Sequence, residues 1–470
     1  MLFSSFEFLF RFLPVFLVIY YLTPKKFRNV TLLGGSIVFY TIGEAGYITI
    51  LLACVLVNYT LTRLMYRKST DGRGIRQKRL LLLALGYDLG VLFFFKYSGL
   101  ASGLPLGISF YTFQIMAYVI DVYRGRIPAE QSLLRLGTYL TMFPQLISGP
   151  ITNYADVRVA LGRERTIKAR QLEEGMKLLI IGLAAKVVIA DRIGTLWNSI
   201  RMIGFDSIST KLAWMGAFAY SLQLYFDFAG YSMMARGIGK MLGFELPVNF
   251  RYPYISKSVT EFWRRWHITL GRWFREYVYI PLGGNRKGKA RTFFNLFVVW
   301  SLTALWHGAN YNFLIWGGIL LCCLLVEKLF LLRLLDKSSR QFGATVGHAG
   351  QLMLDKSRVI GHLYVLFVVP LSWVAFAVTD LSELGVYMTR LFPFAGHAAG
   401  VINHLDYLKY LNDYAPLFLL GVLFATPLPE TCYRLIERKW IGRVVLLGIF
   451  GLCMYYLAVS ANNPFLYFNF

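Results

Sequence analysis

The stretch TFFNLFVVWSLTALWHGANYNFLIWGGILLCCLLV occupies residues 292–326 and consists of two apolar runs joined by the short polar break HGAN. It contains one imidazole, His307, and no Asp, Glu, Lys or Arg. Similar apolar runs of about 17–22 residues recur along the chain, and helices of that length can cross a ~30 Å hydrocarbon core. The sequence therefore predicts an all-α polytopic membrane protein.

The overall composition supports this class. Of the 470 residues, 56% are hydrophobic, 17% are aromatic and 16% are charged, and the mean hydropathy is +0.51. Soluble domains rarely combine such values. The first apolar run, residues 6–22, lacks a basic n-region and a small-residue cleavage site, so we predict a retained helix and not a removed signal peptide.

The chain is strongly basic, with a net charge of +24 from 49 Lys and Arg against 25 Asp and Glu. In a soluble protein such an excess favours nucleic-acid binding, whereas in a membrane protein it is typical of cytoplasmic loops. We adopt the second interpretation and expect no nucleic-acid partner. The five cysteines show no CxxC or metal-ligand spacing, so we expect neither a disulfide framework nor a metal site.

Basic clusters set the predicted topology, because Lys and Arg are enriched on the cytoplasmic side. These clusters lie at residues 25–28, 63–79, 158–170, 257–291, 333–358 and 434–443. The candidate spans are 6–22, 30–42, 46–66, 80–97, 107–123, 175–195, 211–230, 293–307, 311–330, 360–379, 414–430 and 444–460. We expect about eleven or twelve transmembrane or re-entrant helices in one membrane domain, residues 1–470, with both termini outside. The segment 132–150 carries Pro and Gly breakers and is interpreted as interfacial or re-entrant.

Residues 260–277, TEFWRRWHITLGRWFREY, show an amphipathic pattern when they are placed on one helix at ~100° per residue. One side carries Phe262, Trp266, Leu270, Trp273 and Tyr277, and the other carries Glu261, Arg264, Arg265, Arg272, Arg275 and Glu276. Such a helix suits the plane of the membrane interface. His267 lies at the border between the two sides, where a functional role and hydrogen-bonded packing both remain open.

The next segment, PLGGNRKGKAR (281–291), combines glycines with several cations. Arg286, Lys287 and Lys289 are candidates for contact with the phosphates of a cytoplasmic donor, because backbone amides and cations together bind anions. The segment lacks the GxxxxGK[ST] pattern of a P-loop. An ordinary basic cytoplasmic loop explains the same residues without a ligand, and we favour that explanation.

His307 lies deep in its predicted span, about 22 Å from Thr292 at ~1.5 Å per residue. A titratable side chain at membrane depth is costly and marks a functional site by default. In a continuous helix, Thr303 at i−4 and Asn310 at i+3 share its surface. Gly308 and Asn310 are also candidate helix breakers that would open a cavity beside the imidazole. The alternative is a buried histidine that hydrogen-bonds a neighbouring helix.

Several stretches resemble the membrane-bound O-acyltransferase family, in particular its bacterial alginate-type branch, which is related to the teichoic-acid D-alanyl transfer branch. The resemblance runs from about residue 100 to the C-terminus. It rests on LPLGISFYTFQIMAYVIDVYRG (104–125), FPQLISGPI (143–151), YFDFAGYSMMARGIGKMLGFELPVNFRYPY (225–254), FWRRWHITLGRWFREYVYIPLGGNRKG (262–288), LTALWHGANYNFLIWGG (302–318) and NPFLYFNF (463–470).

The resemblance implies a ring of helices around a central tunnel that joins the two faces of the membrane. It implies that His307 is the catalytic histidine and that His267 is the second histidine of the family. Thr303, Trp306 and Asn310 are then candidates to line or support the tunnel.

Asp227, in YFDFAGYS, is an acidic residue within the run 211–230. It is a further candidate to line the tunnel. The alternative, which we favour, is that it caps a helix end near the cytoplasmic face.

The resemblance predicts an acyltransferase that passes an acyl group, expected to be acetyl, from a cytoplasmic donor towards an exported polysaccharide or cell-wall polymer. The donor is expected to be acetyl-CoA or an acyl-carrier thioester, with no bound cofactor. Expected partners are an extracytoplasmic SGNH-hydrolase-like acyltransferase and a polysaccharide synthase or export machinery, in the cytoplasmic membrane of a bacterium. His307 would act as general base, since an imidazole with an ordinary pKa of ~6.5 suits proton transfer near neutral pH.

Two other classes of protein fit an apolar chain of this kind. A transporter or flippase would carry an acyl group or a lipid-linked precursor without chemistry, although we find no internal repeat or pair of broken helices in the sequence. A non-catalytic scaffold of a polysaccharide synthase complex would tolerate the loss of both histidines.

Overall fold

The computed structural model describes residues 1–66, 74–100, 103–331, 347–395 and 402–459, and within these residues it contains helices and connections but no β-strand. The prediction of an all-α chain is confirmed. The aromatic tail 463–470, part of the family resemblance, lies outside the described residues. Two compact units make up the chain: Met1–Ala184, Phe228–Val248 and Gly448–Phe470 form the first, and Ala185–Asp227 and Asn249–Leu447 form the second.

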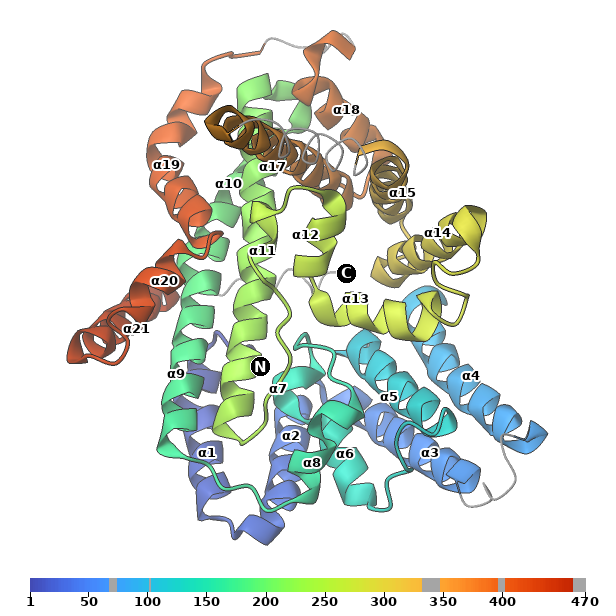
Figure 1. Cartoon of the computed structure of the whole chain (residues 1–470). Helices are drawn as coiled ribbons and strands as arrows, with labels where there is room; N and C mark the ends of the chain where they lie inside the picture. Colours follow the sequence, from blue (N-terminus) through green and yellow to red (C-terminus); the bar gives the residue numbers. More distant parts are fainter. Residues whose placement is uncertain (67–73, 101–102, 332–346, 396–401, 460–470) are drawn as a thin grey trace. The chain divides into compact units, whose positions relative to one another are not determined.

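The first unit consists mainly of helices from the N-terminal part of the chain (Figure 1). They are η1 (Glu7–Phe12), α1 (Leu13–Leu22), η2 (Lys25–Phe27), α2 (Arg28–Glu44), η3 (Ala45–Tyr47), α3 (Ile48–Tyr66), α4 (Ile75–Tyr97), α5 (Ile108–Tyr123), α6 (Leu133–Thr141), α7 (Phe143–Leu146), α8 (Tyr154–Gly162) and α9 (Ala169–Ala184). Two further helices, α11 (Thr210–Met241) and α21 (Trp440–Val459), contribute residues to both units.

Within the first unit, α3 packs against α4, α5 and α6. A buried polar contact joins α3 to α4, because Asn58 Nδ2 donates to Asp88 Oδ1 at 2.7 Å. Both side chains are almost fully buried. A hydrogen bond between helices satisfies polar groups that lipid cannot satisfy, so this contact supports the pairing of the two helices.

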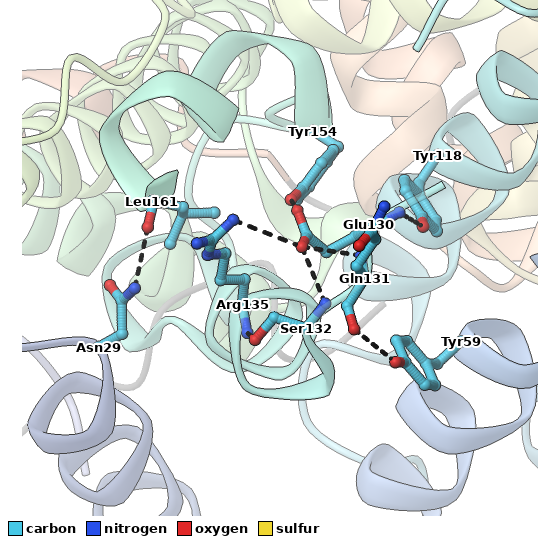
Figure 2. Close-up of polar contacts among 9 residues, drawn as sticks. All are labelled: Asn29, Tyr59, Tyr118, Glu130, Gln131, Ser132, Arg135, Tyr154 and Leu161. Atoms are coloured by element: carbon cyan, nitrogen blue, oxygen red, sulfur yellow. Dashed lines mark hydrogen bonds and ion pairs between the residues drawn. The ribbon is translucent and has the colours of Figure 1, made fainter. Parts of the chain in front are cut away.

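One carboxylate, that of Glu130, holds the connection between α5 and α6 (Figure 2). Its Oε1 accepts from the backbone N–H groups of the next two residues along the chain, at 2.9 Å each. Tyr154 of α8 donates its hydroxyl to Oε2 of the same carboxylate. The backbone N–H of Glu130 donates to the Tyr118 hydroxyl of α5 at 2.8 Å. Glu130 therefore links three helices: its backbone contacts α5, and its buried carboxylate contacts α8 and the residues that lead into α6.

The segment 132–150 forms two short helices, α6 and α7, which break at Met142. The nine residues of α6 rise only about 14 Å, too little to cross a ~30 Å core. This segment does not form a spanning helix, as we expected from its breakers, and its residues from 136 to 150 are buried within the protein.

Each of the twelve predicted spans coincides with helix over most of its length. Five helices in the described part of the chain are long and apolar enough to cross a membrane, or six if the bent pair α19–α20 counts as one. Several carry exposed large apolar side chains, such as Leu82 and Leu83 of α4, which suit a lipid environment. The larger number of eleven or twelve spans, and the central tunnel, stay predictions.

The second unit contains the remaining helices (Figure 1). They are η4 (Ala185–Ala190), α10 (Asp191–Ile203), η5 (Phe205–Ser207), η6 (Pro253–Ile255), α12 (Val259–Arg265), α13 (Ile268–Phe274), η7 (Arg275–Tyr279), α14 (Gly288–His307), α15 (Tyr311–Val326), η8 (Glu327–Leu331), α17 (Gly347–Ala377), α18 (Leu381–Leu391), η9 (Pro393–Ala395), α19 (Asp406–Phe424) and α20 (Leu428–Arg434). In this unit α14 packs against α15, and α15 packs against α12 and α17.

The predicted continuous helix over residues 260–277 is wrong, because the chain bends between α12 and α13 (Figure 1). Trp266 is extended, and His267 is left-handed with φ 43° and ψ 52°. Two backbone groups at the break find partners outside the helix: the N–H of Ile268 donates to the Asn249 carbonyl at 2.9 Å, and the Arg265 carbonyl accepts from the N–H of Arg251 at 2.9 Å. These bonds to a distant segment compensate for the helical bonds that the bend removes.

Candidate active site

His307 is the last residue of α14, and Gly308 after it has an extended backbone with φ 166° and ψ 175°. A Cβ built on Gly308 would lie 2.6 Å from Cε2 of the Phe313 ring. A larger residue therefore cannot occupy this position unless the phenyl ring moves. The predicted helix break at Gly308 is confirmed, and α15 begins at Tyr311.

The prediction that Thr303, His307 and Asn310 share one helical surface is wrong for Asn310. Because α14 ends at His307, Asn310 does not lie one turn further along the same helix; it is the exposed residue that precedes α15. Thr303 is buried, and its hydroxyl donates to the carbonyl of Val299 in its own helix at 2.8 Å. Thr303 thus supports α14 one turn before the histidine.

The His307 ring is 8% exposed and lies among aromatic side chains from two other helices. Its centroid is 4.9 Å from that of Phe376 and 5.0 Å from that of Trp316, both nearly perpendicular, and 6.0 Å from that of Phe313. Asn312 joins the two helices, since its Nδ2 donates to the Phe376 carbonyl at 2.9 Å. Walls of this kind exclude water and strengthen the electrostatic interactions of an imidazole.

His267 is also buried, at 3% exposed, and its backbone conformation is unusual. Among the non-glycine residues that the structure describes, it shares a positive φ only with Tyr252. Such conformations cost about 1–3 kcal/mol and cluster at functional sites. Burial lowers the pKa of His267 from 6.5 to about 3, so the ring is neutral at physiological pH.

One side chain, Asn249, fixes the tautomer of His267. Its Oδ1 accepts from the backbone N–H of Thr269 at 3.2 Å and from the Thr269 hydroxyl at 2.9 Å. The backbone N–H is an obligate donor, so the facing atom of Asn249 is the oxygen and not the amide nitrogen. His267 Nδ1 lies 3.2 Å from the same oxygen and must carry the proton. The Nε2 atom then has the lone pair and can accept a hydrogen bond.

The indole of Trp306 connects the two histidines. Its ring centroid lies 4.6 Å from that of His307 and 6.2 Å from that of His267. Trp306 is 5% exposed. The structure therefore brings together three of the predicted site residues, from the end of α14 and the start of α13, in one buried cluster.

Asp227 lies within α11 and not at a helix end, so the predicted capping role is wrong. Its carboxylate is 1% exposed and lies 2.8 Å from Lys186 Nζ. The same ammonium lies 2.6 Å from Asp191 Oδ1. A lysine between two carboxylates compensates for the cost of burying these charges. The role of Asp227 in a tunnel stays a prediction.

The basic loop lies far along α14 from His307. Arg286, Lys287 and Lys289 are exposed, and Lys289 precedes His307 by roughly 27 Å of helix at ~1.5 Å per residue. The loop itself is well anchored, since Asn295 Nδ2 donates to the Gly284 carbonyl at 2.8 Å. The structure does not bring these three cations to the histidines, and a phosphate contact there stays a prediction.

Asn249 and Asn312 are polar residues of the site that the sequence did not single out. Asn249 is the one amide in PVNFRY, whereas Asn312 follows Asn310 in NYNFLI, and neither belongs to a periodic pattern. A signal was present for Asn249, since it lies in the stretch 225–254 that carries the family resemblance. Its partner, His267, is 18 residues away along the chain, and only the fold shows that they meet.

Comparisons with known proteins identify the family of the chain. The model of the membrane-bound O-acyltransferase family matches residues 37–347. A probable alginate O-acetylase of Pseudomonas putida is 34% identical over 100% of both chains, and a peptidoglycan O-acetyltransferase of Helicobacter pylori is 29% identical over 100% of this chain and 98% of its own. A teichoic acid D-alanyltransferase of Bacillus subtilis is 32% identical over 46% of this chain and 58% of its own. The chain therefore belongs to the membrane-bound O-acyltransferase family and is a multi-pass membrane acyltransferase.

Proposed function

We propose that this acyltransferase moves an O-acetyl group from a cytoplasmic thioester donor towards an exported polysaccharide or cell-wall polymer, with His307 as the catalytic base. The observation that carries the proposal is the buried cluster of His307, Trp306 and His267. The full-length similarity to proteins named as O-acetylating enzymes of alginate and peptidoglycan supports the acetyl group and the polymer class.

In the proposed reaction, a ring nitrogen of His307 removes the proton from an acceptor hydroxyl. The hydroxyl oxygen then attacks the carbonyl carbon of the thioester, a new C–O bond forms, and the C–S bond breaks. The imidazolium gives its proton to the departing thiolate. This step leaves a neutral thiol and returns His307 to its neutral form. General-base catalysis of this kind contributes about 10²–10⁴-fold in rate.

His267 acts in this scheme as a neutral hydrogen-bond acceptor near Trp306. Asn249 holds its Nδ1–H, so Nε2 presents a lone pair. A neutral ring can accept a hydrogen bond without adding a second positive charge beside a protonated His307. The aromatic walls keep water from the thioester, whose hydrolysis competes with transfer.

The remaining parts of the proposal concern the surroundings of the enzyme. The acyl group crosses a tunnel between about eleven or twelve helices of the cytoplasmic membrane. The donor is acetyl-CoA or an acyl-carrier thioester. An extracytoplasmic SGNH-hydrolase-like partner completes the transfer to the sugar, beside a polysaccharide synthase or export machinery.

The test is the O-acetyl content of the exported polymer in cells that carry His307→Ala. We expect acetylation to be lost while the amount of the protein in the membrane stays normal. His404→Ala is the matched control, because His404 is exposed and lies in a different segment; it should acetylate normally. Normal acetylation in both variants would contradict a catalytic role and favour a scaffold.

A second experiment separates an enzyme from a transporter. A labelled acetyl donor is supplied to vesicles that contain the protein, and the label is followed into the thioester pool and the acceptor. An enzyme yields an ester bond to the acceptor that depends on His307. Appearance of unchanged donor on the far side, without any ester, would indicate transport.

A further inference from the structure

A pocket of about 290 Å³ lies in the first unit, at the start of α2 and α9. Its lining includes Tyr21, Lys25, Arg28, Ile167, Lys168 and Leu172. Two basic clusters that the sequence assigns to the cytoplasmic side, 25–28 and 158–170, thus meet at one cavity. The proposed acyl transfer makes no use of this pocket.

Buried positive charge beside this pocket lacks a carboxylate partner. Arg28 and Arg165 are 8% and 7% exposed. Their hydrogen bonds are to uncharged groups: Arg28 Nη1 donates to the Arg165 carbonyl, and Arg165 donates to Tyr20, Asn29 and Ala160. Within the described residues, neither guanidinium forms an ion pair.

The same two guanidiniums have hydrogen-bonding capacity left over. Arg28 Nε and Arg165 Nη2 are buried and have no hydrogen-bond acceptor among the residues described. Burying a charged group costs several kcal/mol unless an opposite charge or full hydrogen bonding compensates for it. Arg28 lines the pocket, so an anion bound there would supply the compensation.

Helix ends add to the positive field at the pocket. Arg28 is the first residue of α2, and Lys168 and Ala169 flank the start of the 16-residue helix α9. The N-terminus of a helix carries a partial positive charge that favours anions and disfavours cations. Neither helix has an acidic residue in its first turn. The first residues of two helices and three cations therefore line one cavity, and no acidic residue belongs to its lining.

We propose that this pocket binds a phosphate ester, with the phosphate between Arg28, Lys25 and Lys168. The apolar part of the lining, Ile167 and Leu172, favours an anionic phospholipid of the cytoplasmic leaflet as the source. Charged headgroups attract basic side chains at that leaflet, and each contributes to the affinity. A soluble phosphate ester shares the same chemistry and is the other source.

The test uses the purified full-length protein in detergent and native mass spectrometry. The lipid arms are phosphatidylglycerol, which is anionic, and phosphatidylcholine, which is zwitterionic; the soluble arm is inorganic phosphate, measured by its effect on thermal stability. We expect the protein to retain phosphatidylglycerol in preference to phosphatidylcholine. Stabilisation by inorganic phosphate without a lipid preference would assign the site to a soluble phosphate ester.

Variants connect the binding to the pocket. Lys25→Gln with Lys168→Gln removes two exposed cations and should weaken phosphatidylglycerol binding roughly tenfold. The control, Lys26→Gln with Arg163→Gln, removes the same charge from exposed residues that do not line the pocket and should bind normally. In folded protein, Arg28→Gln should reduce phosphatidylglycerol binding further. Equal binding by the first pair and the control, or no selective binding in any arm, would overturn the proposal.

Discussion

At the scale of the residue, the two histidines of the cluster are held in different ways. His307 is fixed by ring packing against α15 and α17, at the last position of a helix. His267 is fixed by its own left-handed backbone and by a hydrogen bond to Asn249. Packing defines where a ring lies, but a hydrogen bond also defines which nitrogen carries the proton. The clearest mutational test at this scale is therefore Asn249.

Asn249→Ala removes the acceptor for His267 Nδ1–H and for Thr269. We expect acyl transfer to fall about tenfold, in the range typical for loss of a group that orients a histidine, with little change in expression. Asn249→Asp keeps an acceptor oxygen and should restore transfer. Its added negative charge favours protonated His267, so its pH–rate profile should shift to higher pH. If Asn249→Ala and Asn249→Asp lose transfer equally and with the same pH profile, Asn249 does not position the histidine.

The lowered pKa of His267 predicts how stability depends on pH. Between about 6.5 and about 3 the unfolded chain binds a proton at this ring and the folded protein does not. Acid therefore favours unfolding, by up to roughly 1.4 kcal/mol per pH unit. This contribution to stability is fully present above the ordinary pKa and is lost as the pH falls through that window.

Thermal unfolding in detergent between pH 7 and pH 5 measures this effect. The midpoint should fall with pH, and the fall should be smaller in His267→Gln than in the wild type. The exposed His404 provides the control, since His404→Gln should leave the slope unchanged. Identical slopes in His267→Gln and the wild type would contradict a neutral, buried ring.

At the scale of the element, the α14–α15 hairpin determines where His307 lies. The helix α14 ends at the histidine, and the close approach of the Phe313 ring to Gly308 leaves that ring beside His307. Gly308→Ala places a Cβ 2.6 Å from that ring, and overpacking of this kind costs about 1–3 kcal/mol. We expect lower thermal stability and slower transfer, because Phe313 must move and disturb the wall of the site.

A second glycine of the same hairpin provides the control for this substitution. A Cβ on Gly318, within α15, meets no atom within 4 Å, so Gly318→Ala should be neutral or slightly stabilising. Stability and transfer are measured for both variants at equal membrane levels. An equal effect of the two substitutions would show that the contact with Phe313 is not the cause.

The elements were largely predictable, but only some of their ends were. Apolar run length indicated each helix, and Gly308 indicated the end of α14. The bend at His267 was not predictable, because the amphipathic pattern continues through it and the stabilising bonds come from residues 249–251. Asn310 was predicted on the surface of His307 for a similar reason. A position derived from helical periodicity is correct only where the helix continues, and α14 ends before Asn310. Contacts between segments far apart in sequence decided each of these points.

At the scale of the whole molecule, each of the two compact units has its own charged feature. The second unit holds the histidine cluster and the buried Lys186 between two carboxylates. The first holds two buried arginines beside a cavity with basic lining. The net charge of +24 indicated only that the loops are basic. The packing of helices that are distant in sequence determines which cations become buried. It also determines whether a carboxylate lies close enough to form an ion pair with them.

The central claim is that His307 performs the acyl transfer, and the rate of transfer tests it most directly. Membrane vesicles from polymer-producing cells are supplied with labelled acetyl-CoA or acetylated acyl-carrier protein, and ester formation on the polymer is followed over time. His307→Gln should slow ester formation by about 10²–10⁴-fold relative to the wild type, while His404→Gln retains the wild-type rate. Ester formation by His307→Gln at the wild-type rate, with equal protein in the membrane, would contradict the account.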